Sequence, residues 1–414
     1  MEIGCIPISI MKDKQVSGIW KITIDGYRAF YPASLPPKIE WTPELVSKLS
    51  QADQLLVRLS GEARRMPNPH ILIRPFIKRE AVYSSRIEGT QATLGELLAS
   101  EVGAEVERSP DDLREVANYV SALEHGMRRL SEIPLSLRLI REMHEILMSG
   151  VRGELATPGE FRTSQNWIGP AGCTLKEAKY VPPPPDALGE CLRDWEAYLH
   201  NSEEPTLITC ALMHYQFEAI HPFLDGNGRI GRLLISLLLC EKGSLTAPML
   251  YLSAFFNATR PDYYAALNGI SEHGEWMEWL NYFLNGVIRQ TEDVLDRAER
   301  MNAIIEQWKL ETAKMSGASG QVVELLAGNP YITARKAQSL LGIAYNTANR
   351  AILKLVEASI LLPVNEAKRD RVFVAKQLLC ILEEPVRFSG FGSREEQREA
   401  AMQELADIAP GGIS

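Results

Sequence analysis

The sequence has few cysteines and lacks a long apolar run. Its six cysteines include no CxxC pair and no dense framework, which excludes the pattern of a disulfide-stapled secreted domain and favours reduced thiols. The longest strongly apolar run, Leu233–Cys240, is far too short to cross a bilayer, and the N-terminus has no basic start followed by an adequate apolar core. We therefore expect a cytoplasmic protein with no membrane partner.

Positive charge is also in short supply. The chain has 44 Lys and Arg against 53 Asp and Glu, a net charge of −9. This balance disfavours wholesale binding to nucleic acid or to an anionic membrane, although it leaves room for a locally basic module. The 414 residues include 45% apolar and 23% charged residues, as in globular proteins, and this length predicts two or three domains.

Helical periodicity dominates from residue 42 to about residue 300. Thr42 and Pro43 have the residue types of an N-cap and a first helical position, and Gly61 is expected to close that helix. Further helical patterns cover residues 77–90, 110–130, 136–150, 186–200, 207–220, 229–243 and 274–301. The predicted fold class is therefore mainly α.

Three segments depart from this rhythm. Residues 160–185 contain the turn signal GPAG and end in a proline run, which predicts a hairpin followed by a stiff connector. Residues 320–376 predict three short helices and an extended pair around a charged turn, the outline of a winged helix-turn-helix. Residues 393–409 form an amphipathic helix candidate in the tail.

The stretch EAIHPFLDGNGRIGRLL, residues 218–234, is the most informative in the chain. Its three glycines, Gly226, Gly228 and Gly231, spell GxGxxG, the fingerprint of dinucleotide-binding folds. That fingerprint requires a preceding strand, whereas the residues before it have helical spacing. We therefore reject a dinucleotide-binding fold.

A metal site is a second interpretation of the same stretch. His214, Glu218 and His221 are spaced at i, i+4 and i+7 and could share one helical face. Pro222 is expected to end the helix close to His221, and such spacing often arises by chance. We therefore favour a packed His214 and a solvated Glu218 over a set of ligands.

A phosphate site fits the stretch best. Gly226 and Gly228 allow successive backbone N–H groups to turn inward, and the helix expected to start near Arg229 points its positive end at the same place. Arg229 and Arg232, three residues apart, can each bind phosphate oxygens in fork geometry. Asp225 can hold Mg²⁺, and His221 can accept a proton beside the phosphates.

The segment HPFLDGNGRIGR, residues 221–232, resembles the signature of the Fic domain family, His-x-Phe-x-Asp/Glu-Gly-Asn-Gly-Arg-x-x-Arg, and fills every specified position. The resemblance implies a Fic-type helical core with a small β-hairpin flap. It also implies transfer of AMP from ATP to a hydroxyl side chain (Tyr, Thr or Ser) of a target protein. Pyrophosphate would leave as the hydroxyl attacks the α-phosphorus.

Site roles carried over from the family follow the same positions. His221 would be the general base, Phe223 would anchor the loop, and Asp225 would hold Mg²⁺. The nucleotide-binding residues would be Gly226, Asn227 and Gly228 in the anion pocket, Arg229 and Arg232 on the terminal phosphates, and Tyr263 and Tyr264 near the adenine. The two tyrosines are equally compatible with the core.

Two further segments resemble family features. Residues 161–181 match the position of the flap, which is thought to align the target segment by strand addition. The alternative is a surface hairpin with no role in target binding. Ser84, Glu88 and Gly89 fit the inhibitory motif Ser/Thr-x-x-x-Glu-Gly/Asn on a helix before the core. We expect Glu88 to pair with Arg229 and to keep that arginine from the γ-phosphate.

The basic module left open by the overall charge lies near the C-terminus. Residues 320–376 contain eight Lys or Arg against four Asp or Glu, so the winged helix could bind DNA or could equally serve for docking or dimerisation. The resulting division is residues 1–100 with the inhibitory helix, 101–300 the Fic core, 301–385 the winged helix and 386–414 the tail. The sequence leaves open whether the protein forms a homodimer.

Three functions remain in competition. The leading prediction is an autoinhibited protein adenylyltransferase that modifies target proteins or itself. The second is a DNA-binding regulator whose Fic core senses nucleotide without turnover. The third is the reverse enzyme, in which Glu88 positions water to remove AMP. The signature does not exclude members of the family that transfer other phosphate-linked groups.

Overall fold

The computed structural model describes residues 17–65, 69–151, 157–170, 172–315, 317–364 and 371–386. These residues are mainly helical, with two small antiparallel sheets, which confirms the predicted fold class. The predicted tail helix at residues 393–409 lies outside them. Within the described part of the chain, no helix combines the length and apolar character needed to cross a bilayer.

The N-terminal part is a hairpin followed by a long helix. Strands β1 (Gly18–Ile22) and β2 (Arg28–Pro32) pair in antiparallel register, and α1 (Pro43–Arg65) follows. The side chain of Thr42 accepts a hydrogen bond from the Leu45 N–H at 3.2 Å, as expected for the predicted N-cap. The helix continues past Gly61 to Arg65, because an isolated glycine weakens a helix without ending it.

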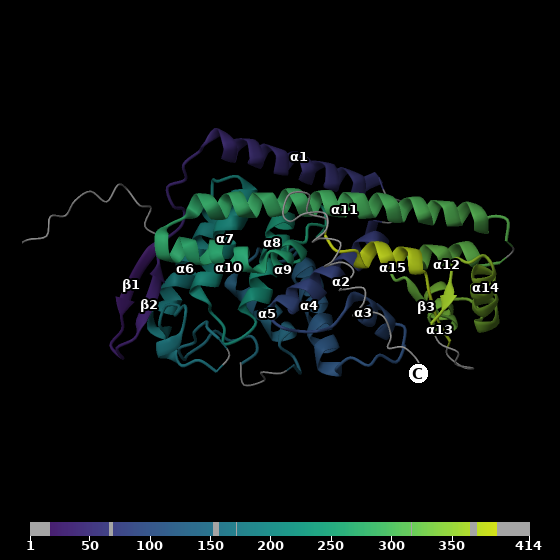
Figure 1. The fold of residues 1–414 in the computed structure, drawn as a ribbon, viewed down its shortest axis with the longest axis horizontal. Coiled ribbons are helices and arrows are strands. Elements are labelled where there is room, and N and C mark those ends of the chain that lie inside the picture. Colours follow the sequence, from purple (N-terminus) through teal and green to yellow (C-terminus); the bar gives the residue numbers. More distant parts are fainter. Residues whose placement is uncertain are drawn as a thin grey trace, which may run out of the picture.

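The central part is a cluster of helices around α7 (Thr206–Ile220) and α8 (Asn227–Glu241). All residues of α7 except Thr206 and Glu218 are buried, since α6, α8, α11 and β2 pack against it. The surrounding helices are α2 (Pro69–Ile87), α3 (Leu94–Ser100), α4 (Pro110–Arg129), α5 (Leu137–Leu147), α6 (Pro185–Asn201), α9 (Ser253–Ala258), α10 (Arg260–His273) and α11 (Trp276–Thr312). Figure 1 shows α1 and α11 lying along the top of this cluster.

The segment predicted as a hairpin is less regular than expected. Ile168 and Tyr180 form one isolated antiparallel bridge, and a short 3-10 helix, Leu175–Glu177, lies between them. Regular strand pairing does not extend beyond this bridge in the described residues of the segment. The proline run then leads directly into α6, which starts at Pro185. We call residues 161–181 the flap segment.

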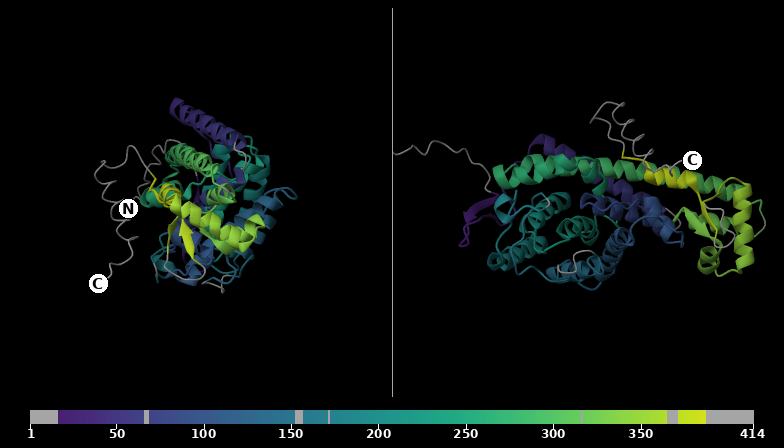
Figure 2. Two further views of the ribbon diagram at one scale, coloured as in Figure 1. Left: turned by 90° about the vertical axis from the view of Figure 1, so that its right-hand side faces the viewer. Right: turned by 60° about the horizontal axis from the view of Figure 1, so that its bottom comes forward.

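The C-terminal part packs against the far half of α11 (Figure 2). It contains α12 (Ser319–Leu326), β3 (Tyr331–Thr333), α13 (Ala334–Leu341), α14 (Tyr345–Glu357), β4 (Leu362–Pro363), β5 (Val372–Val374) and α15 (Lys376–Glu383). The strands form one antiparallel sheet in the order β3-β5-β4. This element order agrees with the predicted winged helix, which stays a prediction. The predicted boundary between residues 300 and 301 falls inside α11, which runs unbroken from the core to this part.

Candidate active site

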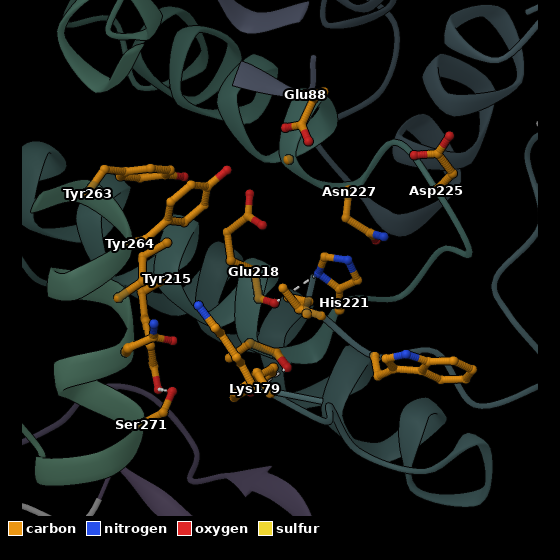
Figure 3. Close-up of a pocket in the computed structure, with 18 of the residues that line it drawn as sticks. Glu88, Lys179, Tyr215, Glu218, His221, Asp225, Asn227, Tyr263, Tyr264 and Ser271 are labelled. Atoms are coloured by element: carbon orange, nitrogen blue, oxygen red, sulfur yellow. Dashed lines mark hydrogen bonds between the residues drawn. The ribbon is translucent and has the colours of Figure 1, made fainter. Parts of the chain in front are cut away.

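A cavity of about 560 Å³ opens where several elements end. The turn after α2, the flap segment, the C-terminal end of α7, the loop from residue 221 to residue 226, the start of α8 and one face of α10 line it. Figure 3 shows Glu88 reaching into this space from the turn after α2, and Glu218 and His221 from the C-terminal end of α7. The family motif and the inhibitory motif, distant in sequence, therefore meet in one cavity.

His221 sits at the C-terminal end of α7 in a left-handed conformation, with φ 49° and ψ 61°. Its Nδ1 lies 3.2 Å from the carbonyl oxygen of Glu218. A carbonyl only accepts, so Nδ1–H donates and Nε2 is left as a proton acceptor. Burial lowers the pKa of His221 to about 4. The imidazole is therefore neutral near pH 7, as a general base requires.

Two residues that the sequence did not single out hold the turn at His221. The guanidinium of buried Arg162 donates to the carbonyl oxygens of His221 at 2.9 Å and Pro183 at 2.5 Å. The amide of Asn166 donates to the carbonyl oxygens of His221 at 3.2 Å and Phe223 at 2.7 Å. Both belong to the flap segment, so the flap and the base-bearing turn form one hydrogen-bonded unit. Isolated polar residues in a loop carry no periodic signal that would have revealed this.

Phe223 anchors the loop, as the resemblance implies. Its ring is fully buried and stacks on His144 with centroids 3.7 Å apart and planes 6° apart. Nδ1 of His144 accepts from the Gly159 N–H, so Nε2–H donates to the Asp225 carbonyl at 3.0 Å. Asn227 exchanges two hydrogen bonds with the Phe223 backbone, each 2.8 Å. The side chain of Asn227 therefore braces the loop, and His144 is a second support that the sequence did not reveal.

Helix α8 starts at Asn227, two residues earlier than predicted, with Gly226 as its N-cap. The first backbone N–H groups of a helix have no partner within it, and they carry partial positive charge. Here Gly226, Asn227 and Gly228 line the cavity. The start of α8 is therefore suited to bind an anion, and it faces the same space as His221.

Glu88 forms its ion pair with Arg232. Glu88 Oε1 lies 2.6 Å from Arg232 Nη2, and Arg232 also donates to the Ser84 hydroxyl at 2.8 Å and the Ser84 carbonyl at 2.9 Å. Burial raises the pKa of Glu88, but the Arg232 guanidinium outweighs this and holds it below its ordinary value. Gly89, at φ 106°, follows directly after α2. The three predicted inhibitory residues therefore lie together at the end of α2.

The predicted pairing of Glu88 with Arg229 is wrong. Arg229 is buried on another side of α8, with Nη1 3.6 Å from Glu115 Oε2 and Nη2 3.5 Å from Asp225 Oδ1 and 3.6 Å from Met148 Sδ. Residues three apart differ by about 60° around a helix, which is enough to aim Arg232 at α2 and Arg229 at α4 and α5. The phosphate-binding role of Arg229 stays a prediction, and it would require the guanidinium to leave this pocket.

Close approach explains why residue 228 is glycine. A Cβ at this position would lie 2.4 Å from Glu88 Oε1 and 2.9 Å from Arg232 Nη1. Any side chain there would push the carboxylate away from the start of α8. Gly228 thus makes room for the Glu88–Arg232 ion pair directly over the helix N-terminus.

Tyr263 and Tyr264 form the wall opposite His221, but they differ in burial. Tyr263 is buried, its ring stacks on Phe256 with centroids 4.5 Å apart, and its hydroxyl lies 2.7 Å from His214 Nε2. Tyr264 is 39% exposed and presents its ring to the cavity (Figure 3). Tyr263 is therefore partly a core residue, and Tyr264 has the ring that is available for stacking on a nucleobase. Both nitrogens of His214 are hydrogen-bonded, to Tyr263 and to the Gly231 carbonyl, so neither is free for a metal.

Asp225 is the residue suited to hold Mg²⁺. Its carboxylate is 51% exposed and lies at the start of α8. The described residues contain no cluster of three metal-ligating side chains. Mg²⁺ in nucleotide sites is bound by one or two carboxylates, with substrate phosphates and water completing its shell, so the single carboxylate fits the ion.

A pocket with a neutral histidine, the start of a helix, an arginine and an aromatic wall has the groups that a nucleotide-binding site requires. Sequence comparison agrees with this interpretation. The Fic/DOC family N-terminal profile matches residues 46–128, and the Fic/DOC family profile matches residues 134–239. This part of the chain therefore has the domains of the Fic/DOC family.

Individual relatives match over part of their length. The "Protein adenylyltransferase Fic" of Drosophila yakuba is 30% identical over 178 residues, covering 40% of this chain and 34% of that protein. Its Drosophila melanogaster counterpart is 29% identical over the same length. The chain thus spans about a third of these relatives. A Fic family protein from Desulfovibrio desulfuricans G20 superposes with a TM-score of 0.56 and 20% identity, over 87% of this chain and 100% of that one, which supports the fold.

Proposed function

We propose that the protein transfers AMP from ATP to a hydroxyl side chain of a target protein, or of itself, and that Glu88 inhibits this reaction at rest. The observation that carries the proposal is the 2.6 Å ion pair between Glu88 and Arg232, placed over the start of α8 in the cavity that contains His221. A carboxylate in that place occupies the position that fits an anionic phosphate. The names of the curated relatives support the same reaction.

In the reaction, the phosphates of ATP bind at the start of α8 and against Arg232. Tyr264 offers a ring for the adenine, and the flap segment holds the target backbone beside His221. The target hydroxyl oxygen attacks the α-phosphorus, the bond from that phosphorus to the bridging oxygen breaks, and pyrophosphate leaves. Nε2 of His221 takes the hydroxyl proton. Mg²⁺, held by Asp225, would neutralise phosphate charge.

Inhibition follows from competition for one guanidinium. While Arg232 is bound to Glu88 and Ser84, its donors point at α2. A phosphate must displace the carboxylate to reach them, and like charges prevent both from occupying the site. The pair of Glu88 with Arg229 that the sequence predicted is thus replaced by a pair of Glu88 with Arg232.

Labelled nucleotides test the proposal. Full-length protein carrying Glu88→Gly is incubated with Mg²⁺ and each α-labelled nucleoside triphosphate, beside wild type and the matched Glu88→Gly, His221→Ala double variant. We expect protein-bound label from ATP, much more with Glu88→Gly than with wild type, and none with the double variant. Equal, low labelling of wild type and Glu88→Gly would contradict inhibition by Glu88. Labelling from a nucleotide other than ATP would show that the transferred group is not AMP.

A role in binding DNA is supported by one observation on the C-terminal part. Helix α14 exposes Asn346, Thr347 and Arg350 near its start, which are residue types that contact base edges and phosphates. The predicted backbone contact at residues 366–371 lies largely outside the described residues. A shift assay on the full chain at low and high salt tests this role, since binding that is absent even at low salt argues for protein docking instead.

Removal of AMP is the remaining alternative. Glu88 is 36% exposed toward the cavity and shares it with His221, as a residue that positions water would. If Glu88 acts in this way, wild-type protein releases AMP from a purified modified target and Glu88→Gly protein does not.

A further inference from the structure

Glu218 is a cavity residue that the proposed reaction leaves without a task. It is one of two residues of α7 that are not buried, and it lies one turn before His221. Figure 3 shows its carboxyl group in the middle of the cavity, between Tyr264 and His221 and below Glu88. The residue was expected to be solvated, but Oε1 is buried and has no hydrogen-bond partner among the described residues.

Arg232, Tyr263 and His214, which lie near Glu218, donate to or bond with other groups. Arg232 donates to Ser84 and Glu88. Tyr263 bonds to His214, and the second nitrogen of His214 bonds to the Gly231 carbonyl. Burial raises the pKa of Glu218 to about 7, and the nearby Glu88 adds to this while Arg232 opposes it. Oε1 is therefore an unsatisfied buried acceptor in the free protein, which is unfavourable, while the other side of the same carboxyl group faces the cavity.

The fold makes room for this carboxyl group. A Cβ at residue 231 would lie 2.5 Å from Glu218 Oε1, so glycine at this position leaves room for the carboxyl group beside α8. An acceptor that is unfavourable in the free protein, and that the neighbouring helix accommodates, is the arrangement expected of a group whose partner arrives with a ligand.

The position of Glu218 identifies the part of the ligand it meets. The phosphate site lies at the start of α8 and at Arg232, and the ring of Tyr264 lies on the other side of the carboxyl group. A nucleotide that spans these two places brings its sugar, or the donor edge of its base, to Glu218.

Resting on the proposed function, we propose that Glu218 determines nucleotide specificity by accepting a hydrogen bond from a donor on the nucleoside, either a ribose hydroxyl or the exocyclic amine of adenine. Above a pH of about 7 the Glu218 carboxyl group is charged. A hydrogen bond to a charged acceptor contributes about 1.5–3 kcal/mol, so at pH 8 an analogue that lacks the donor should bind about 10- to 100-fold more weakly. His221 remains the base, and Glu218 takes no part in bond breaking.

Binding measurements on full-length protein test this inference without turnover. The parent carries Glu88→Gly and His221→Ala, and its affinities for ATP, 2′-deoxy-ATP, 3′-deoxy-ATP and purine riboside triphosphate are compared by calorimetry. We expect the parent to disfavour at least one analogue by about 10- to 100-fold. Adding Glu218→Met, which has no acceptor of comparable strength, should reduce that preference to less than about threefold, and Glu218→Gln should keep part of it. Weaker binding of a deoxy-ATP would identify a ribose hydroxyl as the donor, and weaker binding of purine riboside triphosphate would identify the exocyclic amine.

Each outcome is informative. An unchanged preference in Glu218→Met would overturn the specificity role while leaving AMP transfer intact, and an absence of ATP binding by the parent would overturn both. Thermal unfolding distinguishes a role in ligand binding from a role in the fold. Because Glu218 Oε1 makes no hydrogen bond in the free protein, Glu218→Gln should not lower the Tm. A Tm lower by more than about 5 °C, roughly 1 kcal/mol or more in a domain of this size, would show that Glu218 supports the fold instead. Glu272→Met, an exposed position on α10 outside the cavity, is the matched control and should leave every affinity unchanged.

Discussion

The identity of the arginine that Glu88 holds can be tested by grading the charge at residue 88. Glu88→Gln keeps the length of the side chain and one acceptor oxygen but removes the charge, and Glu88→Gly removes both. If Arg232 is the partner, each change frees its guanidinium for phosphate. ATP affinity should therefore rise in the order wild type, Glu88→Gln, Glu88→Gly.

The size of the effect follows from the exposure of the pair. Arg232 is 2% exposed and Glu88 36%. The pair thus lies between an exposed ion pair, worth about 0–1 kcal/mol, and a fully buried one, whose loss costs about 3–5 kcal/mol. We take about 2 kcal/mol, which corresponds to a roughly thirtyfold rise in ATP affinity for Glu88→Gly. A neutral hydrogen bond is about half as strong as a charge-assisted one, so Glu88→Gln should give a rise of about fivefold.

Calorimetric ATP titrations in two arginine backgrounds complete the test. In Arg232→Met protein the substitution Glu88→Gln should change ATP affinity by less than about twofold, because the residue it acts through is gone. In Arg229→Met protein the fivefold rise should persist. Persistence with Arg232→Met and loss with Arg229→Met would refute the pairing drawn from the structure and restore the one expected from the sequence.

Three further predictions concern the reaction in the Glu88→Gly background. Because burial lowers the pKa of His221 to about 4, kcat at saturating ATP should stay level as the pH falls from 8 to about 5.5 and decline only as Nε2 is protonated near pH 4; an acid limb near pH 6.5 in the rate profile would contradict this. Arg162→Lys should lower kcat by about a hundredfold through displacement of His221 and leave ATP affinity within about twofold, whereas Arg193→Lys, on the outer side of α6, should change neither. Asp225→Asn should raise the Mg²⁺ concentration for half-maximal labelling by at least about tenfold, the loss seen for even an outer-shell partner, while an unchanged Mg²⁺ requirement would place the ion elsewhere.

The local signals of the sequence predicted the elements well. The Thr42–Pro43 pair marked the start of α1, and helical spacing marked α7 and α8 on either side of the loop. Turn and proline signals located the flap segment but suggested more pairing than the single Ile168–Tyr180 bridge. The reason is that turn residues indicate where a chain reverses, whereas ladder length depends on how the two arms pack against the core.

These local signals could not predict contacts between residues that are far apart in the sequence. Arg162 and His144 hold the loop from positions 59 and 81 residues away from their backbone partners, His221 and Asp225. Neither lies in a motif, and each has a side chain that is equally common on a surface. Only the family signature placed phosphate chemistry at residues 221–232, and even this left open which arginine faces α2, because both lie within the first two turns of α8.

The GxGxxG spacing shows how one pattern can arise from unrelated demands. In dinucleotide-binding folds the glycines serve a tight turn, the approach of a pyrophosphate and helix-to-strand packing. Here Gly228 lies close to Glu88 from the turn after α2, and Gly231 lies close to Glu218 from α7. Both glycines therefore accommodate carboxyl groups of residues that line the cavity. Because the two carboxyl groups are placed against a helix start that favours anions, one is suited to withdraw when phosphate arrives, and the other, farther along the helix, is suited to stay and contact the nucleoside.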